Sequence, residues 1–107
     1  YLMRAEAKFR KGDAAGALTD INTLRTKRGA AALASGELTL DKILNERGFE
    51  FYWENSRRND LIRFNKYCDA RYEKTSVTPS YKILFPVPLP ANDADKTLTQ
   101  TPGDPSF

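Results

Sequence analysis

The chain has 107 residues, a net charge of +3 and 29% charged residues, which fits one small domain or a piece of a larger one. Its basic residues are interleaved with acidic ones, so the charge alone does not indicate binding to nucleic acid. Histidine is absent, which excludes a Ser-His-Asp or Cys-His nucleophile system within the chain and most zinc sites. There is no glycine-rich phosphate loop, no apolar run as long as a membrane span and only one cysteine, Cys68. We therefore predict no bound cofactor and no metal.

The first two predicted elements form a helical hairpin over residues 1–29. Apolar residues at helical spacing predict a helix over residues 1–10 and a second over 14–28. Gly12 fits the end of the first helix and Asp13 fits the N-cap of the second. So short a connection makes the two helices antiparallel neighbours. The opening residues are helical in character with no N-cap before them, so we expect the helix to begin upstream of a C-terminal fragment.

Two further helices are predicted within residues 39–66, after a loop of small residues. Thr39 is expected to cap the first of them, which should extend to about residue 54. That helix carries apolar residues on two sides, which is typical of an interior helix. The second helix should begin at about residue 60 and end with this segment.

The predicted character changes over residues 75–107. Prolines there disfavour helix and favour extended backbone, with short turns at residues 92–93 and 102–103. Apolar residues are interspersed with these prolines, so we expect the tail to pack rather than to be disordered. The apolar residues are Ile83, Leu84, Phe85, Val87, Leu89 and Leu98.

The highest density of charge lies between Glu46 and Phe64. Three glutamates recur there at every fourth position, so they share one stripe of the predicted helix. One interpretation is the carboxylate pair of a glycoside hydrolase, but such acids must flank a cleft rather than point the same way. The other is pairing with nearby arginines, which the spacing favours, because buried charge is tolerated only when paired. The predicted structural ion-pair network comprises Glu46, Arg47, Glu50, Glu54, Arg57, Asp60 and Arg63.

The same stretch contains five aromatic side chains, which suit either of two roles. Aromatic faces stack on sugars and bases, but they also fill protein cores. Helical spacing and apolar neighbours favour core packing here. The nearby arginines alternate with acids, which favours pairing within the chain over contact with nucleic acid. The aromatic residues are Phe49, Phe51, Tyr52, Trp53 and Phe64.

Three segments of the chain follow one another in the order found in a known family. They are the hairpin, the acid–arginine block of residues 40–64, and the closing motifs at 84–88 (Leu-Phe-Pro-Val-Pro) and 98–103 (Leu-Thr-Gln-Thr-Pro-Gly). Together they resemble the C-terminal part of the SusD/RagB family of outer-membrane nutrient-binding lipoproteins. One departure is the pair Asn55-Ser56, which stands where the family usually has a glycine-containing turn.

The resemblance implies a mainly α, SusD-like fold. We expect a tetratricopeptide-like hairpin, two further helices and an irregular proline-rich C-terminal segment. Residues 1–107 would then form a single C-terminal portion of a larger domain, with the tail wrapping its body.

The resemblance also implies a function without a catalytic step. Such a protein is a cell-surface lipoprotein of an outer membrane that captures an oligosaccharide for a TonB-dependent transporter of the SusC type. Its membrane attachment is a lipid on an N-terminal cysteine, a role that the internal Cys68 does not fill. The family's glycan contacts vary between members, so none is assigned to a residue of this chain.

A second interpretation remains open beside this one. The hairpin resembles a tetratricopeptide unit, with Ala5, Gly12, Asp13 and Ala17 at matching positions, although Lys8 stands where tyrosine is preferred. A helical-repeat adaptor that binds proteins or peptides would then be expected. A glycoside hydrolase is the third and least favoured possibility.

Overall fold

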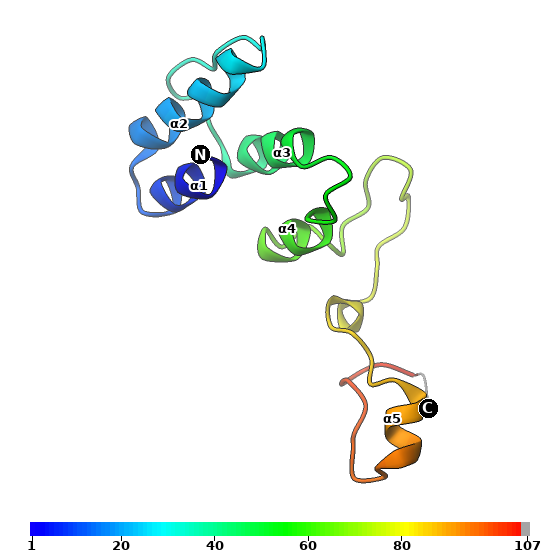
Figure 1. Cartoon of the computed structure of the whole chain (residues 1–107). Helices are drawn as coiled ribbons and strands as arrows, with labels where there is room; N and C mark the ends of the chain where they lie inside the picture. Colours follow the sequence, from blue (N-terminus) through cyan, green and yellow to red (C-terminus); the bar gives the residue numbers. More distant parts are fainter. Residues whose placement is uncertain (106–107) are drawn as a thin grey trace. The chain divides into compact units, whose positions relative to one another are not determined.

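The computed structural model describes residues 1–105 and divides the chain into two compact units, Tyr1–Phe64 and Asn65–Phe107. Residues 1–105 contain helices and loops but no strand, so the mainly α prediction is confirmed. None of the helices described is both long and apolar enough to cross a membrane. The prediction that the whole chain is one portion of a larger domain stays a prediction. The helices are α1 (Leu2–Arg10), α2 (Ala14–Lys27), α3 (Leu40–Glu50), α4 (Arg57–Arg63), the 3-10 helix η1 (Ser80–Ile83) and α5 (Leu89–Ala94) (Figure 1).

Helices α1 and α2 form the predicted hairpin and lie side by side (Figure 1). Gly12 adopts a φ of 89°, a left-handed conformation that glycine reaches without steric cost. The Asp13 carboxylate accepts a hydrogen bond of 2.8 Å from the backbone N–H of Gly16, so its predicted N-cap role is confirmed. Ala5 and Ala17 are fully buried, and such small side chains allow two helices to approach closely.

A buried carboxylate, that of Asp20, ties the two helices of the hairpin together. Arg4 donates to it through Nε at 2.9 Å and through Nη2 at 2.6 Å, while Lys8 Nζ lies 3.0 Å away. The hydrogen bonds from Arg4 lower the pKa of Asp20 to about 2, against the smaller opposing effect of burial. The hairpin therefore combines apolar packing with a carboxylate that is shielded from water while the Arg4 side chain paired with it stays exposed.

The loop after α2 is held by side-chain hydrogen bonds. Asn22 makes two of them with the backbone of Leu33, donating at 2.9 Å and accepting at 2.8 Å. Leu38 is buried, and Thr39 Oγ1 accepts a hydrogen bond from the backbone N–H of Lys42, so its predicted capping of α3 is confirmed. α3 packs against α1, and α4 packs against α3.

The predicted boundaries of the two central helices are wrong by a few residues. α3 ends at Glu50, because Trp53 and Asn55 adopt φ values of 67° and 57° and turn the chain out of the helix. Asparagine is one of the few residues besides glycine that reaches this conformation readily, so Asn55 can substitute for a turn glycine. α4 begins at Arg57 rather than at residue 60.

The second unit differs from the tail that was predicted. Helix is not absent from the proline-rich stretch, since η1 and α5 occur there. Pro79 immediately precedes η1 and Pro90 lies in the first turn of α5, where proline removes no intrahelical hydrogen bond. The side chains of Leu84, Phe85 and Leu89 are exposed, so they do not pack within the second unit itself. That the tail packs against the body of the protein stays a prediction.

The Asp20 ion pair predicts a specific loss of stability in acid. Because the folded pKa of Asp20 is about 2 and lies below its unfolded value, its contribution is present above about pH 4 and is lost as the pH falls towards 2. We expect Asp20→Asn to lower the free energy of unfolding at pH 7 by on the order of 1–2 kcal/mol. Urea unfolding of the full-length protein from pH 7 to pH 2 measures this effect.

Asp93→Asn is the matched control, because Asp93 pairs with Lys96 on an exposed surface at 2.7 Å. The Asp20 variant should show a shallower decline in stability below pH 4 than either the wild type or this control. If stability declined with falling pH in parallel for the wild type and both variants, the stabilising role assigned to Asp20 would be contradicted.

Candidate functional site

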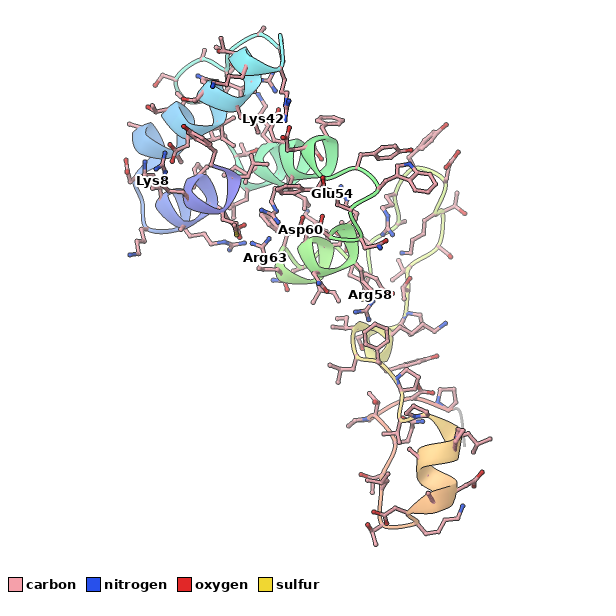
Figure 2. The ribbon with its side chains drawn as sticks, viewed as in Figure 1. Lys8, Lys42, Glu54, Arg58, Asp60 and Arg63 are labelled. Atoms are coloured by element: carbon pink, nitrogen blue, oxygen red, sulfur yellow. The ribbon has the colours of Figure 1, made fainter. Side chains whose placement is uncertain are left out.

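Besides the ion pairs of Asp20 in the hairpin, charged side chains gather in two further groups within Tyr1–Phe64. The first group, here called the α4 cluster, connects α1, α3 and α4 and includes residues labelled in Figure 2. The second group, here called the α2–α3 pairs, connects the last turn of α2 and the C-cap residue after it to the last two turns of α3. The α4 cluster comprises Glu6, Arg10, Arg47, Asp60 and Arg63, and the α2–α3 pairs are Arg25–Glu46 and Arg28–Glu50.

Asp60 is the centre of the α4 cluster and is only 2% exposed. Its Oδ1 lies 2.9 Å from Nη2 of Arg47 and 2.6 Å from Nη2 of Arg63. Arg47 is also buried, and its guanidinium lies 5.0 Å from the centre of the Phe51 ring. Two cations thus neutralise one buried carboxylate, and α4 is fixed against α3.

Glu6 extends the α4 cluster to α1. It is 5% exposed, accepts a hydrogen bond from Arg63 and accepts another of 2.9 Å from Nε of Arg10. The guanidinium groups of Arg10 and Arg63 each lie 5.0 Å from the ring centre of the buried Phe64. Arg63 therefore bridges the acids of two helices while it packs on an aromatic ring.

The α2–α3 pairs lie closer to the surface. Arg28 donates to both oxygens of Glu50, with distances of 3.1 Å from Nε and 2.6 Å from Nη2. These hydrogen bonds lower the pKa of Glu50, against a smaller opposing effect of burial. Arg25 and Glu46 form the second pair, whose side chains are less exposed.

Arg57 joins α4 to α3 through the backbone rather than through an acid. Its Nη1 donates to the carbonyl oxygen of Leu44 at 2.8 Å. A Cβ at Gly48 would lie only 2.9 Å from that same nitrogen, so the glycine leaves space for the guanidinium. The absence of a side chain at position 48 thus explains how the arginine reaches the helix backbone.

The structure brings together only part of the predicted ion-pair network. Arg47, Asp60 and Arg63 meet, but Glu46 and Glu50 pair with α2 instead. Glu54 lies exposed in the turn after α3 (Figure 2). That the network serves structure alone stays a prediction.

Four participants in these groups were missed by the sequence analysis, namely Glu6, Arg10, Arg25 and Arg28. Glu6 and Arg10 are four residues apart on α1, a spacing that indicates a local pair, but nothing in the sequence links Glu6 to Arg63, which lies 57 residues away. The pairing of Arg25 and Arg28 was indicated by the sequence. They are three residues apart and share one helical face, as do Glu46 and Glu50, which are four residues apart.

The aromatic side chains do not fill the core as predicted. Phe49 and Tyr52 are each 75% exposed and Trp53 is 87% exposed, so the prediction is wrong for these three. Phe64 is buried, and Phe51 is half-buried beside Arg47. The rings of Tyr52 and Trp53 meet edge to face, with centroids 6.1 Å apart. The last turn of α3 and the turn after it therefore carry aromatic surface.

Two hollows adjoin these groups. One of about 520 Å³ is lined by the α4 cluster together with Met3, Ala7, Ser56 and Asn59. The other, of about 610 Å³, lies between α2 and α3 beside Phe49. Residues 1–105 contain no group of histidine, cysteine or acidic side chains arranged to hold a metal ion.

The sequence matches the SusD family over residues 1–82, which includes the hairpin, α3 and α4. The chain belongs to the SusD family. It is 36% identical to the starch-binding protein SusD of Bacteroides thetaiotaomicron over an alignment covering 96% of the chain. The alignment covers 20% of that relative, so the chain spans about a fifth of its length. Both groups of ion pairs lie within the segment that matches the SusD family.

The buried position of Asp60 predicts that it is essential for stability. Asp60→Ala leaves Arg47 charged and buried without its partner, and we expect a loss of about 3–5 kcal/mol in the free energy of unfolding. Asp93→Ala removes an exposed partner and should change this energy by less than about 1 kcal/mol. Denaturant unfolding of the full-length protein compares the two, and equal losses would refute the assigned role.

Proposed function

We propose that the protein is the glycan-binding component of an outer-membrane nutrient-uptake system. The observation that carries this proposal is family membership, together with 36% identity to a relative that binds starch. On this proposal the protein captures an oligosaccharide and performs no chemical step on it. The present chain supplies a helical body with a hollow beside the exposed aromatic side chain of Phe49.

The state of the carboxylates supports a binding protein over a glycoside hydrolase. A glycosidase needs one protonated carboxylic acid with a raised pKa, opposite a second carboxylate. Glu46, Glu50 and Asp60 are each paired with arginine instead. The pKa of Glu50 is lowered, which is opposite to the requirement for a general acid.

The proposal includes a partner and a location. The captured oligosaccharide is passed to a TonB-dependent transporter of the SusC type, and an N-terminal lipid holds the protein at the outer membrane. Family membership is the support for both. The adaptor hypothesis has less support, because the match to the SusD family runs through the hairpin and accounts for it without an array of repeats.

A glycan array probed with the full-length protein tests the binding function. We expect binding to at least one class of neutral oligosaccharide, with maltoheptaose included because a relative binds starch. Incubation with each bound glycan should release no reducing ends. Absence of binding across the array would reject the proposed function, and release of reducing ends would favour a hydrolase.

Purification from membranes tests the partner separately. The full-length protein should co-purify with a TonB-dependent transporter after mild detergent extraction, and identification by mass spectrometry reports the partner. Recovery of soluble peptide-binding complexes instead would favour the adaptor hypothesis.

A further inference from the structure

We propose that the hollow between α2 and α3 is a subsite for one neutral sugar ring. Phe49 supplies the stacking face, and the Arg28–Glu50 pair supplies hydrogen bonds to the sugar hydroxyls. This inference rests on the proposed carbohydrate-binding function and gives it a location in the chain.

The shape and composition of the hollow suit a small polar ligand. Its volume of about 610 Å³ falls within the range of small-molecule sites, and its lining combines apolar and polar groups. Leu24 is half-buried and contributes an apolar wall, while Arg25 and Glu46 contribute a second ion pair. An aromatic ring beside orienting polar groups is the arrangement that a sugar, with its C–H face and hydroxyl rim, requires.

Phe49 is available for stacking because the described fold does not use it. The side chain lies in the last turn of α3, it is 75% exposed, and it lines the hollow. A residue needed for the core would be buried, as Ile43 and Leu44 are on the same helix. Exposing so much aromatic surface is unfavourable unless a ligand or another segment covers it.

The Arg28–Glu50 pair retains hydrogen-bonding capacity beyond its own two bonds. A guanidinium has five N–H donors and a carboxylate has about four acceptor positions, of which the pair uses two each. Sugar hydroxyls both donate and accept, so the remaining positions on the two side chains complement them. The opposite charges cancel, which favours a neutral sugar over an anion.

The hollow beside the α4 cluster is less suited to this role. Its central acid and base, Asp60 and Arg47, are buried and committed to each other. Arg10 and Arg63 of that cluster both lie over the ring of Phe64, and this ring is buried. A sugar there would find charges but no aromatic face.

Calorimetric titration of the full-length protein tests the subsite. The probes are maltoheptaose, cellohexaose, xylohexaose and mannohexaose. For a glycan that binds the wild type, we expect Phe49→Ala to weaken affinity about tenfold. Glu50→Gln keeps the shape but weakens the ion pair, and should weaken affinity about threefold. Tyr72→Ala is the matched control, since Tyr72 is an aromatic residue of the second unit and is 91% exposed.

The possible outcomes separate this inference from the function on which it rests. Binding that is retained within about twofold in Phe49→Ala would overturn the subsite and leave the proposed function standing. No binding of any probe by the wild type would overturn both. A melting temperature lowered by Phe49→Ala, but not by Tyr72→Ala, would show that polypeptide rather than sugar covers the ring, and would also overturn the subsite.

Discussion

The arrangement of α1, α3 and α4 depends on the charge of one buried carboxylate. A carboxylate removed from water is stable only when cations and hydrogen bonds replace its hydration. Asp60 obtains both from Arg47 and Arg63, and Arg63 also reaches Glu6 on α1. The pairing sets which faces of the three helices meet. The buried apolar residues of these helices then fill the space between those faces, and they include Leu2, Ile43, Leu44 and Leu61.

Features encoded by local chemistry were predicted well from the sequence. Capping by Asp13 and Thr39 and the turn at Gly12 depend only on neighbours within three residues, so the residue types are sufficient to identify them. The same holds for the hairpin, because the short connection of residues 11–13 leaves few arrangements for the two helices. Proline was interpreted too strictly, since its effect depends on whether it falls in the first turn or the interior of a helix.

Features that depend on long-range packing were predicted poorly. Apolar spacing continues through Trp53, so the pattern extends α3 beyond Glu50, whereas the backbone turns away there. The periodicity of apolar residues does not show which face of a helix packs against a neighbour. For this reason Phe49 was wrongly predicted to lie in the core, whereas its ring is exposed. The partners of Glu46 and Glu50 lie 21 and 22 residues away, and only the packing of α3 in the unit brings them together.

The α4 cluster is not fully satisfied, and this has a consequence for what it contributes. Within the described residues, Nε and Nη1 of Arg47 and Oδ2 of Asp60 are buried without a hydrogen-bonding partner. Each such atom retains a dehydration penalty that a methyl group in its place would not incur. Apolar side chains of similar volume would therefore give equal or greater stability. Apolar packing is less directional, however, and does not by itself favour a single register of the helices. We infer that the charges make one position of α4 on α3 more stable than the alternatives. Apolar contacts alone would leave several such positions nearly equal in free energy.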